Sequence, residues 1–162
     1  VAKDSQSLCT VMMMIDNKEE VECIHDSGSQ IISMSAEIAS DIGLSYDPNI
    51  VLNMQSANGT MDRLLGLARN VPCTIGNMTI YLQIHVLWSL TYDILLGHPF
   101  DVLTRSTVNT LSNVETTITI TDPNTGQWRT IPTFPRSKSK TNNRQNVRFK
   151  TEAPRCFHCR RH

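Results

Sequence analysis

Near the start of this chain of 162 residues, a strand-like segment is followed closely by an acid, a hydroxyl and a glycine. Val21-Glu22-Cys23-Ile24 has the composition of a strand, and Asp26-Ser27-Gly28 follows it after one residue. Gly28 lets the backbone come close and leaves its N–H free to bind a carboxylate. An ordinary turn has the same composition, because Asp and Ser bind their own backbone and Gly tolerates positive φ. The motif alone leaves a structural turn and a catalytic carboxylate as alternatives.

A second segment, Tyr92 to Leu103, contains an apolar pair followed by glycine. Leu95-Leu96-Gly97 suits a strand in a crowded interior, because Gly has no side chain at the closest backbone approach. Pro99 suits the first turn of a helix, where its missing N–H costs little. By themselves these residues fit an ordinary core strand and helix start equally well. Their meaning depends on where they lie relative to Asp26.

Between the two segments, Asn58-Gly59 predicts a hairpin turn, because both central positions favour positive φ. We expect its arms to be residues 51–56 and 60–65. An Asn-Gly sequence is usually only a turn, so a functional role for it rests on its place in the order of the three segments.

That order, from Val11 to Arg105, resembles the retropepsin-like aspartic proteases, and the sequence is most similar to protease domains of fungal long-terminal-repeat retrotransposon polyproteins. The resemblance implies an all-β fold, a closed β-barrel of a single lobe with one or two short helices, which dimerises. It also implies a set of site residues. The catalytic residues would be Asp26, Ser27 and Gly28, the flap over the substrate would contain Ala57, Asn58, Gly59 and Thr60, and Leu95, Leu96 and Gly97 would support the active site.

The chain has one Asp-Ser-Gly motif, whereas a two-lobed aspartic protease carries both aspartates in one chain. Two copies must therefore meet. The resemblance predicts a homodimeric aspartic endopeptidase that cleaves its own retroelement polyprotein, using water activated by paired Asp26 and neither metal nor cofactor. Two other hypotheses stay open, a catalytically inactive module for dimerisation or interaction and nucleic-acid binding by a basic tail. The intact Asp26, Ser27 and Gly28 favour the protease.

The charges divide the chain. Residues 1–135 carry six Lys or Arg against fourteen Asp or Glu, and residues 136–162 carry nine against one. We expect an N-terminal segment over 1–10, a protease domain over 11–135 that includes an added hairpin at 116–132, and a basic, disordered tail over 136–162. The tail is predicted to be a linker within a longer polyprotein, with a weak nucleic-acid contact as the alternative.

The cysteines indicate the compartment. Cys9, Cys23 and Cys73 lie in strand-like contexts, which is typical of free, buried thiols in a reducing environment. No stretch approaches the roughly 18 apolar residues that a membrane helix needs. We expect a cytoplasmic protein, free or within virus-like particles, that contacts no membrane.

The tail contains Cys156 and Cys159, with His158 and His162 beside them. This spacing suggests a zinc site, but it supplies only half of a ligand set before the chain stops. Redox-active or incidental cysteines are the favoured interpretation.

Several further elements can be predicted from the pattern. We expect a hairpin of residues 11–16 and 20–25 with Met12, Met13 and Met14 buried, a helix over 33–42, a pair of strands at 66–75 and 78–87, and a helix over 99–104. Ile80, Leu82, Ile84 and Val86 should face the core. His25 occupies a position that is normally apolar in the family, so it either titrates beside the catalytic pair or points outward from its strand.

Overall fold

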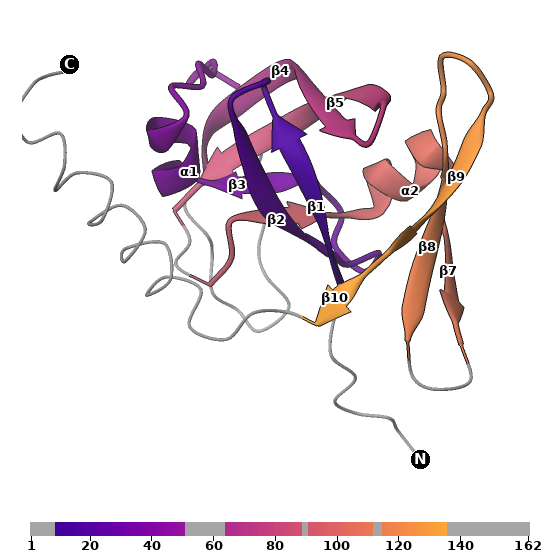
Figure 1. Cartoon of the computed structure of the whole chain (residues 1–162). Coiled ribbons are helices and arrows are strands. Elements are labelled where there is room, and N and C mark those ends of the chain that lie inside the picture. Colours follow the sequence, from indigo (N-terminus) through magenta and orange to yellow (C-terminus); the bar gives the residue numbers. More distant parts are fainter. Residues whose placement is uncertain (1–8, 51–63, 89–90, 112–114, 136–162) are drawn as a thin grey trace, which may run out of the picture.

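The computed structural model describes residues 9–50, 64–88, 91–111 and 115–135 (Figure 1). Within them the chain is almost entirely β, with two short helices, as the sequence predicts. Seven strands form one sheet and three form a second sheet beside it. No helix in these four ranges is long and apolar enough to cross a membrane.

The first hairpin joins β1 (Cys9–Ile15) to β2 (Glu19–His25). Its turn places Asp16 and Asn17 at φ values of 55° and 57°, the left-handed region that short polar residues tolerate. The prediction that three successive methionines are buried is wrong. Only Met13 is in the core, and Met12 and Met14 are exposed, because successive side chains of a strand point to opposite faces.

The helix expected from residue 33 begins three residues later. Ser33–Ser35 forms β3, because it pairs with a strand on each side, and α1 follows as Ala36–Asp41. Ser35 is the N-cap, and its Oγ accepts a hydrogen bond from the N–H of Ile38 at 3.3 Å. Gly43, at φ +68°, follows the end of the helix.

The strands predicted at 66–75 and 78–87 form a long hairpin of β4 (Leu64–Ile75) and β5 (Met78–Leu87), which turns at Gly76. The four alternating residues of β5 expected in the core, Ile80, Leu82, Ile84 and Val86, are all buried. β4 also has an irregularity where Asn70 adopts φ 52° and exchanges hydrogen bonds with Gln83. Such a bulge bends a long strand and favours curvature of the sheet.

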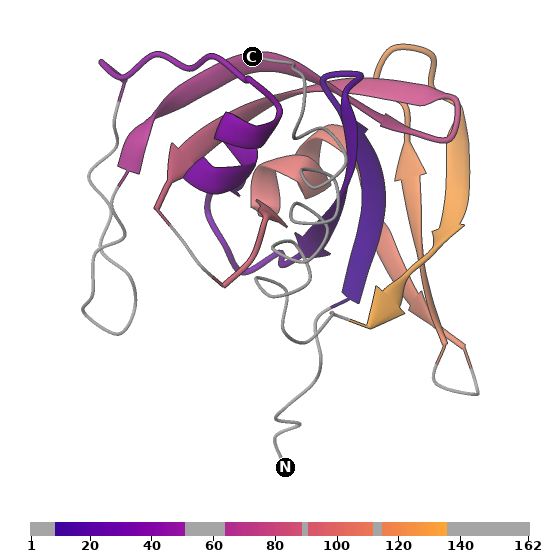
Figure 2. The same ribbon diagram turned by 60° about the vertical axis from the view of Figure 1, so that its left-hand side comes forward.

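Six strands close into a barrel in the order β1, β2, β6, β3, β5, β4, and β4 pairs with β1 again at Ile15 and Cys73 (Figure 2). The short strand β6 (Ile94–Leu96) runs parallel to β2 and lies between it and β3. Full closure leaves no free edge within the barrel. The apolar side chains of these strands form one core, and Phe100 of helix α2 (His98–Thr104) packs into it.

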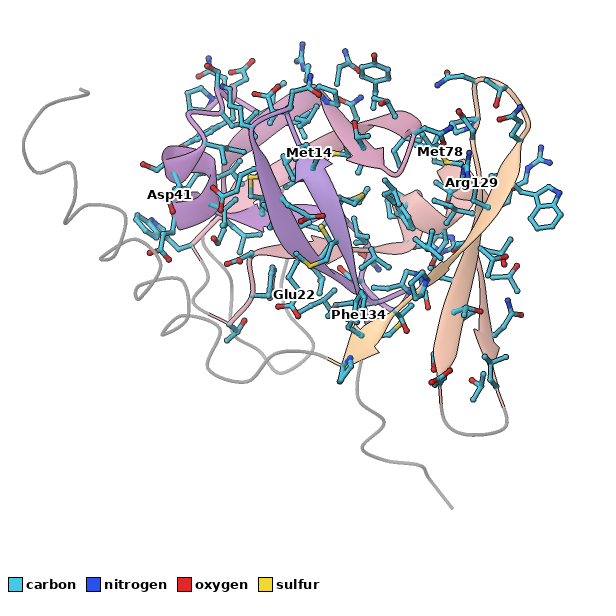
Figure 3. The ribbon with its side chains drawn as sticks, in the orientation of Figure 1. Met14, Glu22, Asp41, Met78, Arg129 and Phe134 are labelled. Atoms are coloured by element: carbon cyan, nitrogen blue, oxygen red, sulfur yellow. The ribbon has the colours of Figure 1, made fainter. Side chains whose placement is uncertain are left out.

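The second sheet contains β7 (Thr107–Thr110), β8 (Thr116–Thr121) and β9 (Trp128–Pro132), paired antiparallel in that order. β8 and β9 lie within the range predicted for a hairpin. β10 (Phe134–Pro135) then returns to the barrel and pairs with the start of β1, where Phe134 is labelled in Figure 3. Sequence patterns did not indicate β7 or β10, because neither has an alternating apolar face.

Candidate active site

The Asp26 loop begins where β2 ends. The N–H of Asp26 donates to the carbonyl of Leu96 at 3.0 Å, which fixes the start of the loop to β6. The N–H of Gly28 donates to Asp26 Oδ1 at 3.0 Å, and the N–H of Ser29 donates to the Asp26 carbonyl at 3.1 Å. The Asp26 residue is half-buried, whereas Ser27 and Gly28 are exposed. The loop therefore holds a carboxylate at the molecular surface with a backbone donor on one oxygen.

β6 and the glycine that follows it lie against this loop. Leu96 is buried, Leu95 is half-buried, and Gly97 follows them at a point of very close backbone contact. A Cβ atom on Gly97 would lie 2.1 Å from the carbonyl oxygen of Ile31 and 2.8 Å from that of Ser29. The prediction that Leu95 and Leu96 lie in a crowded part of the structure, with the closest backbone contact at Gly97, is therefore confirmed. The structure brings this segment together with Asp26.

Replacing Gly97 by Ala is expected to lower the free energy of unfolding by about 3 kcal/mol, because backbone atoms must shift to admit the methyl group. Gly76→Ala is the matched control. Gly76 has nothing within 4 Å of its Cβ position, so that variant should lose only about 1 kcal/mol from the strain of a non-glycine residue at φ +61°. Urea denaturation measures both, and equal losses would show that crowding at Gly97 is not the cause.

His25 is buried, and its side chain packs toward α2. From the sequence, His25 was expected either to point outward from its strand or to titrate beside the catalytic pair of aspartates. The outward orientation is wrong. His25 Nε2 lies 2.6 Å from Asp101 Oδ1, and the ring meets Phe100 edge to face with centroids 6.1 Å apart. The pKa of His25 rises to about 9, first through the neighbouring Cys9 side chain and then through the Asp101 carboxylate, against the desolvation that lowers it.

Sequence reasoning missed Asp101 and its second partner. Ser106 Oγ also donates a hydrogen bond to Asp101 Oδ1, so one carboxylate oxygen binds two side chains from different segments. The signal was present as an ionisable residue at position 25, where an apolar one is usual. A buried His needs a polar partner. Asp101, four residues beyond Gly97, could be recognised as that partner only from the pairing of β6 with β2.

The predicted flap residues Ala57, Asn58, Gly59 and Thr60 lie outside the described residues. The described chain on each side of that gap is held together. The backbones of Asp47 and Leu67 exchange hydrogen bonds of 2.8 and 3.1 Å, and a Cβ on Gly66 would lie 2.4 Å from the carbonyl oxygen of Asp47. The described residues before and after the gap are therefore joined between Asp47 and Leu67, a residue of β4.

The cysteines were expected to be free thiols, and Cys9, Cys23 and Cys73 are unpaired by disulfides. Burial, with a further contribution from the charge of Asp16, raises the pKa of Cys73 to about 12. Within the described part of the chain no group of three or more His, Cys, Asp or Glu is arranged to hold a metal ion. Cys156 and Cys159 lie outside that part.

Comparison with known proteins agrees with this geometry. The sequence model of a family described as aspartyl protease matches residues 11–100, which include both the Asp26 loop and β6. The chain belongs to this aspartyl protease family. Among curated protein sequences, none matches the chain significantly.

Solved structures share the aspartyl protease fold of the chain. The retroviral protease-like domain of Ddi1 from Leishmania major superposes with a TM-score of 0.63 at 18% identity, over 81% of this chain and 97% of that domain. EIAV protease, solved in complex with the inhibitor HBY-793, superposes with a TM-score of 0.50 at 11% identity, over 63% of this chain and 92% of that one. The closed all-β barrel of this protein is therefore retropepsin-like.

Proposed function

We propose that this aspartyl protease is an active endopeptidase whose catalytic site forms between two copies of the chain, each contributing Asp26. The observation that carries the proposal is the geometry of the Asp26 loop. It presents one carboxylate at the surface, held by the Gly28 N–H at 3.0 Å and tied to the buried strand β6. One such loop per chain supplies half of a two-carboxylate site.

Two Asp26 side chains within hydrogen-bonding distance would share one proton, since two adjacent carboxylates do not both ionise easily. The ionised carboxylate would act as general base toward a water molecule, and the protonated one would act as general acid toward the scissile carbonyl. Gly28 would orient each carboxylate through its N–H. Ser27, which is exposed beside it, would join the two loops by hydrogen bonds across the dimer.

The region after the active-site loops supports the proposed homodimer. β7 is exposed at all four positions, its outer edge has no partner strand among the described residues, and Thr107-Val108-Asn109-Thr110 carries no charge. Exposed edge strands of soluble proteins are often protected by charged side chains, which β7 lacks. Exposed apolar side chains lie on α2 (Val102 and Leu103), in β7 (Val108) and directly after β7 (Leu111). We call these four residues and β7 the α2–β7 surface, and we propose that a second copy covers it.

The proposed substrate is an extended polypeptide that Ala57, Asn58, Gly59 and Thr60 would cover as a flap, while Leu95, Leu96 and Gly97 keep the catalytic loop in place. By resemblance, that polypeptide is the polyprotein of a retroelement that also encodes this domain. We place this processing in the cytoplasm or in virus-like particles. The domain that acts is residues 11–135, with 1–10 and 136–162 as flanking segments.

Incubation of the purified protein with a peptide library between pH 4 and pH 7, followed by mass spectrometry of the new termini, tests the activity. Cleavage inside peptides is the expected result. A dimeric protein that generates no new termini would favour the alternative of a catalytically inactive interaction module.

The role of residues 136–162 is a separate prediction. Their nine Lys or Arg can neutralise phosphates, and such binding weakens steeply with salt. Deleting 136–162 is expected to leave peptide hydrolysis nearly unchanged and to abolish any salt-sensitive retention on single-stranded RNA, because residues 1–135 carry a net charge of −8. If the full-length protein shows no retention at low salt, the nucleic-acid hypothesis fails and the linker hypothesis stands.

A further inference from the structure

A connected set of three polar side chains joins the end of β2 to α2 and to the residue before β7. His25, the last residue of β2, contacts Asp101 on α2, and Asp101 also accepts a hydrogen bond from Ser106, the residue before β7. The side chains of His25 and Asp101 are only 8% and 16% exposed. His25, which is 76 residues from Asp101 in the sequence, and Ser106, which is five residues from it, thus meet at one carboxylate oxygen.

Such a contact is costly unless both partners are present. Removing one member of a buried ion pair leaves an uncompensated charge in the interior, whereas an apolar pair of similar volume is often as stable as the ion pair. An apolar residue at position 25 would therefore have been the simpler solution for the core. Unlike an apolar contact, the ion pair is directional, because it fixes the His25 ring to one carboxylate oxygen of Asp101.

The orientation of His25 matters for the catalytic loop, because His25 immediately precedes Asp26. The N–H of the next residue, Asp26, donates to the carbonyl of Leu96 on β6 at 3.0 Å, while the Asp26 carbonyl accepts a 3.1 Å hydrogen bond from Ser29 within the same loop. Ser106 leads directly into β7, the edge proposed to meet the second copy. A shift of His25 relative to α2 would therefore move the catalytic loop relative to that edge.

We infer that His25, Asp101 and Ser106 form a positioning network that holds the Asp26 loop in register with α2 and with β7. This inference rests on the proposed function, since it gives the network a role in hydrolysis. His25 and Asp101 are positioning residues, because they act through Asp26 and touch no reacting atom.

The titratable groups acting on His25 are Cys9 from β1 and Asp101 from α2. The folded pKa of about 9 lies above the unfolded value of 6.5, so the contacts of His25 with Cys9 and Asp101 together stabilise the protein fully below pH 6.5. That contribution is lost as the pH rises through 9 and His25 becomes neutral. The network should therefore be intact under acidic to neutral conditions and should open in alkali.

The test compares Asp101→Asn, which removes the charge but keeps the shape, with Asp41→Asn, which removes an exposed carboxylate on α1. In the wild type, NMR titration should place His25 near pH 9, and Asp101→Asn should move it well below that value. The protection of the Asp26 N–H against hydrogen exchange should fall roughly tenfold or more in Asp101→Asn, and kcat should fall by a similar factor with little change in KM. Asp41→Asn should change none of these.

The double variant His25→Leu/Asp101→Leu covers the case in which Asp101→Asn does not fold. Its apolar pair should keep the Asp26 N–H protected and should lack the decrease in protection that we expect in the wild type as the pH rises through 9. If His25 titrates near 6.5 in the wild type, or if the double variant keeps the alkaline decrease, the inference is wrong. Hydrolysis that is normal in folded Asp101→Asn also overturns it while leaving the proposed function in place. If exchange responds as expected but the wild type cleaves no peptide, the proposed function fails and only the structural contact remains.

Discussion

Replacing Asp26 by Asn is expected to reduce peptide hydrolysis by at least about a thousandfold. The amide cannot act as general base toward water, and it cannot share a proton with its counterpart in a second copy. The fold should be preserved, because the amide oxygen can still accept the 3.0 Å hydrogen bond from the Gly28 N–H. The expected change in the free energy of unfolding is below about 1 kcal/mol.

The measurement compares initial rates on a peptide that the wild type cleaves, together with the unfolding curve and the oligomeric state of each protein. Asp41→Asn is the matched control, because Asp41 is an exposed acid on α1 and its replacement should leave the rate unchanged. Equal rates for the wild type and Asp26→Asn, with both proteins folded, would mean that another group or a contaminating protease performs the hydrolysis.

The parts of the fold that sequence could predict are those in which local pattern and tertiary packing agree. The alternation of Ile80, Leu82, Ile84 and Val86 has the period of a strand, and all four are buried in β5. The first hairpin and its turn follow from the same kind of local signal. The methionine run failed because three identical residues contain no alternation, so only the barrel could decide that Met13 faces inward.

Ser33–Ser35 shows a second kind of limit. Its residues fit a helix start, and Ser35 does cap a helix, but pairing with β5 and β6 makes the three residues a strand. Propensity is a weak prior that tertiary contacts override. β7 was not predicted because all four of its residues are exposed. A strand without a buried face has no alternating apolar pattern.

For the candidate site, the motif and its order were enough to place Asp26 beside Leu95, Leu96 and Gly97. Local sequence patterns do not show that two distant segments pair in parallel. That pairing was expected from the resemblance to the family. The partner of His25 could not be inferred in the same way. Asp101 lies 76 residues away, and the contact depends on how α2 turns back against the end of β2.

Replacing Val108 by Asp is expected to weaken the proposed dimer roughly hundredfold, because it would bury an unpaired charge within the α2–β7 surface. Val108 is 43% exposed in the single chain, so the variant should fold normally. Tyr81→Asp is the control, since Tyr81 is an exposed residue of β5 and lies outside that surface. It should leave both dimerisation and hydrolysis unchanged.

If the active site needs two chains, specific activity must rise with protein concentration and level off once the dimer is saturated. Val108→Asp should move that rise to about hundredfold higher concentrations, with a similar plateau, because each chain keeps its Asp26 loop intact. Analytical ultracentrifugation over the same concentrations should give a dissociation constant that matches the midpoint of the activity curve for each variant. A wild-type rate strictly proportional to concentration, from a protein that sediments as a monomer throughout, would exclude a site shared between two copies. A dimer that resists Val108→Asp would instead place the interface elsewhere and leave the α2–β7 surface without a partner.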